Sequence, residues 1–155
     1  MIVAIVNPAS GSADGGWREK IAAVDGVEIR ETSESCGPDE LAADAARDGA
    51  TEIWACGGDG SVMAVVAGLH RAGKLAETVV AILPAGTANL VATALGLPDD
   101  PDEAIAVATG GTVRTIDLGI SEGTPFALGI GIGLTERLVS EASSEAKKRF
   151  GKLAY

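Results

Sequence analysis

The residues best suited to chemistry form a short glycine run, Gly57, Gly58, Asp59, Gly60 and Ser61. The run stands between an apolar stretch that predicts a strand and one that predicts a helix. Its glycines allow positive φ angles and close approach of the backbone to a ligand. The free N–H groups and positive dipole end of the following helix suit a phosphate, and the carboxylate can orient a metal-bound or hydroxyl-bearing ligand. The alternative is a tight turn that uses glycine for geometry alone, because neither a Walker A nor a GxGxxG motif is present.

Two more polar loops follow predicted strands, at residues 7–12 and 84–89. Asn-Pro marks a turn in the first loop, and the second offers neutral hydrogen-bonding groups near a helix start. Each loop has a plain structural alternative, as a βα turn or as an ordinary helix cap. All three loops fall at one edge of the predicted sheet, so we expect them to converge on one ligand. The residues of interest in the two loops are Asn7, Ser10, Gly11, Gly86, Thr87 and Asn89.

The elements that position these loops alternate between strand and helix. Strands are predicted at 2–6, 27–32, 52–56 and 78–83, and helices at 17–24, 38–47, 88–95 and after Asp100, with residues 62–69 as the interior of a further helix. Continuous apolar runs such as Ile2–Val6 are typical of strands buried on both faces. Repeated strand-to-helix crossovers predict the α/β class, with a three-layer, Rossmann-like parallel sheet and helices on both faces. Asp100 suits an N-cap, with Pro101 in the first turn of the last of these helices.

The pattern changes after about Thr112. Residues 112–120 and 125–133 predict strands joined by a turn at 121–124, and residues 134–150 are compatible with a helix. We therefore predict an α/β domain at 1–118 and the incomplete beginning of a β-rich second domain at 119–155. An incomplete unit would expose the strand near 126–132, which predicts a homo-oligomer through that edge or by exchange of residues 134–155.

Charge and composition exclude several classes of protein. The 155 residues include 22 acidic and 12 basic side chains, a net charge of −10 that argues against nucleic acid as a partner. It also argues against a standing attachment to anionic membranes, and residues 147–149 are more typical of a solvated helix end than of a lipid contact. No apolar stretch reaches the roughly 18 residues of a membrane-spanning helix. Cys36 and Cys56 lack metal-binding or disulfide spacing. We expect a cytoplasmic protein with at most peripheral contact at the inner membrane surface.

The order and spacing of these motifs resemble the diacylglycerol kinase catalytic-domain family, which includes bacterial lipid kinases, sphingosine kinases and ceramide kinases. The matching elements are Asn7-Pro8-x-Ser10-Gly11, the glycine run, Pro84-x-Gly86-Thr87-Ala88-Asn89 and Ile116-Asp117-Leu118-Gly119. The Gly-Gly-Asp-Gly element is shared with NAD kinases and, more loosely, phosphofructokinases, whereas the first and third elements indicate the lipid-kinase side. The resemblance implies ATP and Mg²⁺ in a cleft between an α/β nucleotide domain and a β-rich domain.

The resemblance also implies which residues contact the nucleotide. The expected set is Asn7, Ser10, Gly11, Thr32, Gly57, Gly58, Asp59, Gly60, Ser61, Gly86, Thr87 and Asn89. Asp59 is the candidate catalytic residue, with the role of orienting the triphosphate and its metal; the metal ligands are otherwise unknown. Because the chain has few basic residues, Mg²⁺ is needed to offset the charge of the triphosphate.

The sequence departs from the family pattern at several positions. Ser61 stands where the family usually has threonine, and Met63 and Ala64 stand where it has Asn-Glu. The later acidic motif, which supplies the general base in the family, would lie beyond Tyr155. Our leading hypothesis is an ATP-dependent lipid kinase acting on a diacylglycerol-like hydroxyl, with this chain carrying mainly the nucleotide-binding half. The alternatives are a non-catalytic nucleotide-binding module of the same fold and an NAD kinase-like enzyme.

Overall fold

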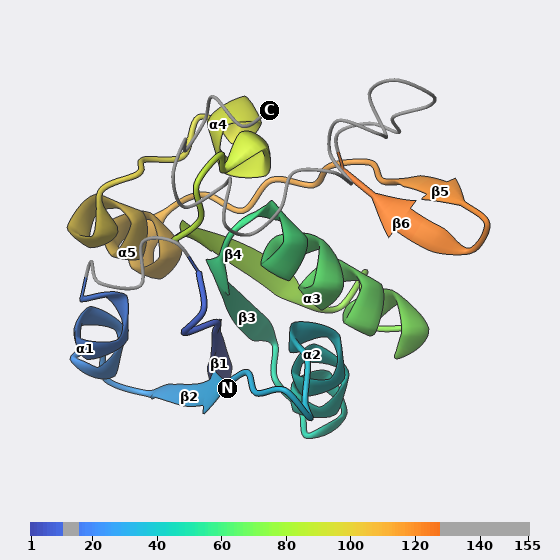
Figure 1. The fold of residues 1–155 in the computed structure, drawn as a ribbon, viewed down its shortest axis with the longest axis horizontal. Coiled ribbons are helices and arrows are strands. Elements are labelled where there is room, and N and C mark those ends of the chain that lie inside the picture. The colour runs from blue at the N-terminus through green and yellow to red at the C-terminus, as the bar shows by residue number, and fades with distance from the viewer. Residues whose placement is uncertain (11–15, 128–155) are drawn as a thin grey trace.

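A four-stranded parallel sheet forms the centre of the computed structural model, which describes residues 1–10 and 16–127. The strand order is β2-β1-β3-β4 (Figure 1). The strands are β1 (Ile2–Val6), β2 (Val27–Glu31), β3 (Glu52–Gly57) and β4 (Val79–Pro84). The helices are α1 (Trp17–Ala22), α2 (Pro38–Arg47), α3 (Asp59–Arg71), α4 (Leu90–Leu95) and α5 (Pro101–Gly110). The predicted α/β class, with a parallel sheet flanked by helices, is confirmed.

The two central strands, β1 and β3, divide the core into two layers. Alternate side chains of a strand face opposite sides of a sheet. Val3 and Ile53 face one layer, which they share with α2 and α3. Ala4 and Trp54 face the other layer, which they share with α1 and α5. In Figure 1 these helix pairs lie on opposite faces of the sheet, which gives the three-layer arrangement.

The contact between α2 and α3 is a close approach of two helix backbones. A Cβ atom at Gly68 would overlap the carbonyl oxygen of Asp39. The facing side of α2 is made of small side chains, and its buried residues are Ala42, Ala43, Ala45 and Ala46. Glycine on one helix and alanine on the other therefore set the distance between them.

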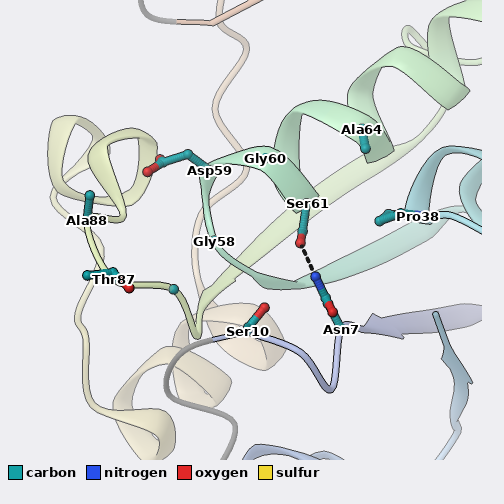
Figure 2. Close-up of a pocket in the computed structure, with 11 residues that line it drawn as sticks. Asn7, Ser10, Pro38, Gly58, Asp59, Gly60, Ser61, Ala64, Thr87 and Ala88 are labelled. Carbon is teal, nitrogen blue, oxygen red and sulfur yellow. Dashed lines mark hydrogen bonds between the residues drawn. The ribbon is translucent and has the colours of Figure 1, made fainter. Parts of the chain in front are cut away.

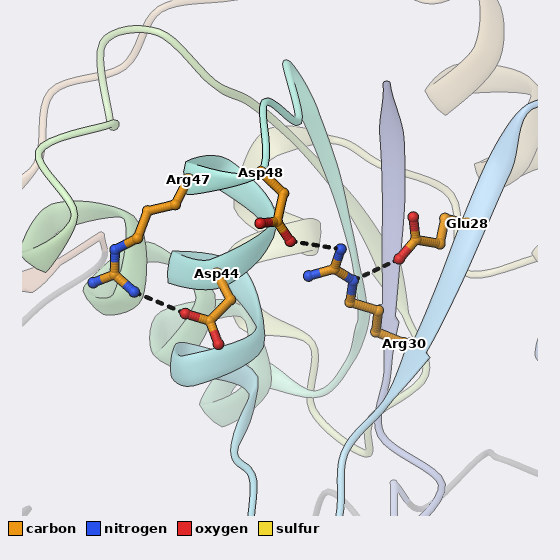
Figure 3. A network of polar contacts seen from close by, with 5 residues as sticks. All are labelled: Glu28, Arg30, Asp44, Arg47 and Asp48. Carbon is orange, nitrogen blue, oxygen red and sulfur yellow. Dashed lines mark hydrogen bonds and ion pairs between the residues drawn. The ribbon is translucent and has the colours of Figure 1, made fainter.

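One ion pair joins the edge strand β2 to the C-terminal end of α2, with a further pair inside each element (Figure 3). The guanidinium of Arg30 donates to Glu28 Oε1 at 2.7 Å and to Asp48 Oδ2 at 3.1 Å. Asp48 caps the C-terminal end of α2, where Arg47 also donates to Asp44 Oδ1 at 2.8 Å. Exposed pairs of this kind contribute roughly 0–1 kcal/mol each to stability. The Arg30–Asp48 pair therefore fixes the position of β2 more than it stabilises the fold.

Several predicted boundaries were wrong by a few residues, and most of the strand predicted at 112–120 was wrong. α3 begins at Asp59, inside the glycine run, and α4 begins at Leu90 rather than at residue 88. Residues 112–118 belong to no strand. Val113 and Ile116 there are 67% and 45% exposed, because no strand in the described part of the chain pairs with them. Asp100, in contrast, caps α5 as predicted, accepting from the amides of Asp102 and Glu103.

A short hairpin follows α5. β5 (Gly119–Ser121) and β6 (Thr124–Phe126) pair antiparallel around a turn at Glu122 and Gly123, both with positive φ. The division into two domains at residue 118 stays a prediction. The predicted strand beyond residue 127, the predicted helix at 134–150, the basic residues 147–149 and the segment expected to exchange all lie outside the described residues. Among the described helices, none is long and apolar enough to cross a membrane.

Candidate functional site

Strand order alone places a crevice at the carboxyl ends of β1 and β3. In the order β2-β1-β3-β4, the chain leads from β1 to β2 on one side and from β3 to β4 on the other, so the connections that follow β1 and β3 leave in opposite directions. Such a switch point is where ligands bind in parallel α/β sheets. Asn7 follows β1 here, and its backbone N–H group donates to the carbonyl of Cys56 near the end of β3 at 3.0 Å. The ends of the two strands therefore hold the first loop beside the glycine run.

A cavity of about 420 Å³ lies at this edge of the sheet (Figure 2). Its walls come from all three loops singled out in the sequence, and also from the starts of α2 and α3. The lining residues are Asn7, Ser10, Pro38, Gly58, Asp59, Gly60, Ser61, Ala64, Gly86, Thr87 and Ala88. The structure therefore brings together eight of the residues expected to contact a nucleotide: Asn7, Ser10, Gly58, Asp59, Gly60, Ser61, Gly86 and Thr87.

Three of the remaining expected residues, Thr32, Gly57 and Asn89, do not line the cavity. Thr32 lies behind it, where its hydroxyl donates to Asn7 Oδ1 at 3.4 Å. Gly57 ends β3, and Asn89 is 8% exposed within its own loop. Gly11 lies outside the described residues. Thr32, Gly57 and Asn89 support residues that reach the cavity, rather than reaching it themselves.

Three lining residues were missed as site residues: Ala88, which lies within the 84–89 loop, and two residues of helices, Ala64 and Pro38. Ala64 is three residues after Ser61, so it lies one turn further along the same face of α3, and helical spacing was a signal for it. Pro38 begins α2 and carries no such signal, because only the packing of α2 on α3 brings it to the cavity. Figure 2 shows Ala64 and Pro38 beside Ser61, where they form an uncharged wall.

The glycine run owes its composition to contact between loops. The expectation of positive φ was wrong, because Gly58 has a φ of −86° and the positive-φ glycines of the described chain lie elsewhere. A Cβ atom at Gly86 would overlap the Cα atom of Gly58, and one at Gly57 would collide with the side chain of Ser61. Gly60 differs, since a Cβ atom there would meet no other part of residues 1–10 or 16–127 within 4 Å. Gly57 and Gly58 of the run, and Gly86 of the next loop, therefore allow close packing, and Gly60 leaves space beside the cavity.

Asp59 joins the glycine run to α4. Its Oδ1 accepts a hydrogen bond from the amide of Val91 at 2.9 Å, so a carboxylate in the first turn of α3 caps the first turn of α4. Asn89, the residue at the N-cap position of α4, makes no side-chain bond to that helix. The second oxygen of Asp59 accepts no hydrogen bond from the described residues, and Asp59 lines the cavity. One carboxylate thus holds two loops together and leaves an acceptor beside the cavity.

Asn89 instead braces the 84–89 loop from within. Its Oδ1 accepts from the Gly86 amide, and its Nδ2 donates to the carbonyls of Pro84 and Gly86, all at 3.0 Å. The residue has a φ of 49°, in the left-handed region that asparagine tolerates better than most residues. Ordinary N-capping, the structural alternative for this loop, is therefore not what the side chain does.

The donor set at the cavity fits an anion. The amides of Asp59 and Gly60 donate to no oxygen of residues 1–10 or 16–127, and they lie at the positive end of the α3 dipole. Among the described residues, no three His, Cys, Asp or Glu side chains are grouped to hold a metal. Asp59 is the acidic residue in the lining. Because Mg²⁺ is commonly bound by one or two carboxylates together with substrate phosphates, this set fits a metal that binds with its phosphate.

The cysteines are unsuited to chemistry here. Burial raises the pKa of Cys56, behind the glycine run, to about 12. Partial burial and the nearby carboxylate of Glu40 raise the pKa of Cys36 as well. Both thiols are free, and their raised pKa values keep them protonated near neutral pH, in which form a thiol is a weak nucleophile.

Sheet order, layers and the switch-point cavity define a doubly wound α/β protein with a ligand site between β1 and β3. Residues 1–120 match the sequence model of the diacylglycerol kinase catalytic domain. The chain belongs to this family.

Individual relatives agree with that placement. A protein of Stenotrophomonas maltophilia named a probable YegS-like lipid kinase is 36% identical over 136 residues, which cover 83% of this chain and 44% of the relative. A protein of the same name from Pseudomonas aeruginosa is 35% identical over 82% of this chain and 41% of its own length. The crystal structure of a diacylglycerol kinase from Bacillus anthracis superposes with a TM-score of 0.68 at 28% identity, covering 81% of this chain and 45% of the other. The chain spans less than half the length of these relatives.

Proposed function

We propose that this chain binds Mg-ATP in the switch-point cavity and forms the nucleotide-binding half of a lipid kinase. The observation that carries the proposal is the meeting of three family motifs at one cavity, at the N-terminus of α3. The reaction transfers the γ-phosphoryl group to the hydroxyl of a diacylglycerol-like lipid. The bond from the γ-phosphorus to the bridging oxygen breaks, ADP leaves, and the lipid oxygen bonds to phosphorus as it loses its proton.

The proposed contacts follow from the chemistry of the lining residues. The free amides of Asp59 and Gly60, with the hydroxyls of Ser61 and Thr87, supply donors for phosphate oxygens. The unengaged oxygen of Asp59 would hold Mg²⁺, which offsets the charge of the triphosphate in a chain with a net charge of −10. Phosphoryl transfer depends mainly on such positioning and charge stabilisation.

Calorimetric titration of Mg-ATP into the protein tests the binding step. We expect binding that weakens when Mg²⁺ is left out and when Asp59→Asn removes the negative charge. This variant keeps an oxygen that can accept from the Val91 amide, so it should still fold. A loss of binding can then be assigned to the lost charge. Absence of heat with the wild-type protein would contradict the proposed binding.

A non-catalytic module is the second candidate, and the position of Ala64 favours it. Ala64 lines the cavity, where the family pattern places a glutamate. The two candidates differ in product formation, so phosphorylation of dispersed diacylglycerol should be measured for the wild type and for Ala64→Glu. Nucleotide binding without product in both, while a lipid kinase relative is active in the same assay, would favour the module. NAD as an alternative acceptor tests the NAD kinase-like reading of the glycine run.

Assembly and membrane contact are separate proposals. We expect a homo-oligomer, which sedimentation velocity over a range of concentrations tests, and a monomer at all concentrations would contradict it. We also expect a cytoplasmic protein that contacts the inner membrane surface only peripherally. Flotation with anionic and neutral vesicles tests the membrane contact, and weak, salt-sensitive binding is the expected result.

A further inference from the structure

The orientation of the Asn7 amide is fixed by its neighbours. The amide of Ala9 donates to Oδ1 at 3.0 Å, and the hydroxyl of Thr32 donates to the same atom at 3.4 Å. A backbone N–H group can only donate, so the side-chain atom that faces it must be the oxygen. The nitrogen, Nδ2, therefore faces Ser61, and it donates to Ser61 Oγ at 3.1 Å (Figure 2).

This contact fixes the direction of the Ser61 hydroxyl. Because Oγ accepts from Asn7, the hydroxyl proton must point away from Asn7. Serine in a helix often donates to the carbonyl four residues earlier, which here belongs to Gly57. That carbonyl accepts instead from the Ala85 amide at 3.1 Å, and Ser61 donates to no oxygen of residues 1–10 or 16–127. Ser61 is only 9% exposed and lines the cavity, so its proton is available to a ligand there.

Serine makes this arrangement depend on a partner. The second substituent on Cβ restricts the side-chain rotamer of threonine, the residue usual at this place in the family pattern. Serine lacks that substituent, so the position of its Oγ depends more on a hydrogen bond, which also sets the direction of the O–H bond. Asn7, held on its other side by Ala9 and Thr32, provides that bond.

We propose that Asn7 is a positioning residue that fixes Ser61 as a hydrogen-bond donor into the cavity. At this point the site accepts a ligand atom that is an acceptor, such as an anionic phosphate oxygen, and disfavours a donor. Where the ligand is ATP, the inference rests on the proposed function. The polarity itself applies to any phosphate-bearing ligand.

A double-mutant cycle with Asn7→Asp and Ser61→Ala tests the proposal. Aspartate keeps the oxygen that accepts from Ala9 and has nearly the same shape, so thermal unfolding should be almost unchanged. It replaces the donor to Ser61 by an acceptor, which turns the Ser61 proton away from the cavity. The added negative charge alone also weakens anion binding, and its effect is measured by Asn7→Asp in the Ser61→Ala background. Ser61→Thr, which keeps the hydroxyl, is the conservative control.

Dissociation constants for Mg-ATP and for magnesium pyrophosphate would be measured across the cycle. We expect Asn7→Asp to raise both dissociation constants about tenfold more with Ser61 present than in the Ser61→Ala background, which has no hydroxyl to misdirect. A factor of about ten is the effect expected for one hydrogen bond to a charged group. The dissociation constants of Ser61→Thr should stay within about threefold of wild type, because threonine keeps the hydroxyl and adds only a methyl group. Equal effects of Asn7→Asp in both backgrounds would overturn the proposal.

The two ligands separate this inference from the proposed function. Coupling seen with pyrophosphate in a protein that does not bind Mg-ATP would uphold the positioning role and contradict nucleotide binding. Binding of Mg-ATP without coupling would leave the proposed function intact and overturn the role of Asn7. A wild-type protein that binds neither ligand would overturn both.

Discussion

The glycine run and the 84–89 loop follow neighbouring strands in the same way, yet they are held in place by opposite means. The run passes directly into α3, a helix of 13 residues with one side buried in the core. The 84–89 loop precedes α4, which has only six residues. It is braced by the side chain of Asn89 and capped from outside by Asp59.

The difference shows that one loop depends on the other. A long amphipathic helix takes its position from its buried face, whereas a helix as short as α4 has little stability of its own. The 84–89 loop therefore relies on Gly58 for space and on Asp59 for a cap, both from the glycine run. Changes in the run should reach the second loop, and changes in the second loop should leave α3 in place.

The largest effect is expected at the contact between the two loops. Gly86→Ala places a methyl group against the Gly58 backbone, which cannot move like a flexible side chain, and should destabilise the protein by about 2–3 kcal/mol. Gly60→Ala is the matched control, because its methyl group approaches no other part of the described chain and alanine favours a helix. Urea unfolding measures both, and equal midpoints for the two variants would contradict the close contact.

The internal brace of the second loop should come next. Asn89→Ala removes three hydrogen bonds and leaves a non-glycine residue in the left-handed region, at a cost of about 2 kcal/mol. Asn89→Gly loses the same bonds without the backbone strain, so it should cost about 1 kcal/mol. Denaturant midpoints test the order, and a glycine variant less stable than the alanine variant would contradict this account.

A smaller effect is expected from the cap between α3 and α4. Asp59→Ala removes the acceptor for the Val91 amide and should cost about 1 kcal/mol, whereas Asp59→Asn keeps an acceptor and should cost less. Hydrogen exchange at the Val91 amide reports the bond directly. We expect faster exchange there in Asp59→Ala, with amides in the middle of α3 unchanged; protection of Val91 equal to wild type would rule out the cap.

The smallest effect concerns an ion pair that anchors α3. Arg71, in the last turn of α3, donates to Asp39 Oδ2 at 2.8 Å and holds the pKa of that carboxyl below its usual range. A lowered pKa in the folded state means stability that is present above the unfolded pKa, about 4, and lost as pH falls through the folded value.

The side chains of this pair are partly exposed, so its contribution should be about 0.5 kcal/mol and sensitive to salt. Asp39→Asn should remove that part of the acid dependence, measured by unfolding between pH 5 and 2. If the stability difference between wild type and Asp39→Asn were the same at every pH in this range, the ion pair would not contribute. Among the described residues, α4 takes part in no such ion pair.

Local patterns were enough to predict the sheet, most of the helices and the edge where the loops meet. Apolar runs such as Ile2–Val6 and the cap at Asp100 depend on neighbouring residues, and the structure agrees with both. The strand predicted at 112–120 was wrong over residues 112–118, because a strand also needs a partner and apolar alternation does not provide one. Residues 62–69 were predicted as the interior of a helix, and α3 contains them; its start at Asp59 was not predicted, since glycines in a helix's first turn look like a loop in the sequence.

The site was predicted in its location but not in its internal connections. Asp59 stands out by its glycine neighbours, whereas its bond to Val91 joins residues 32 positions apart. Asn7 stands out in an Asn-Pro turn, but its bond to Ser61 exists only after β1 and β3 have paired. Such bonds come from tertiary packing, so sequence patterns indicate which residues gather and leave open which of them hold the others.

Gly68 lies more than two helical turns from Asp59, yet it sets one wall of the cavity. Because Gly68 lets the backbone of α2 rest directly on α3 at Asp39, it also fixes the place of the neighbouring Pro38. A larger residue at 68 would act as a wedge between the two helices and move Pro38 away from Ser61. The width of the site is therefore set by a residue that no ligand would touch. The small side chains along the α2–α3 contact determine how close the two helices lie, and so how wide the cavity is.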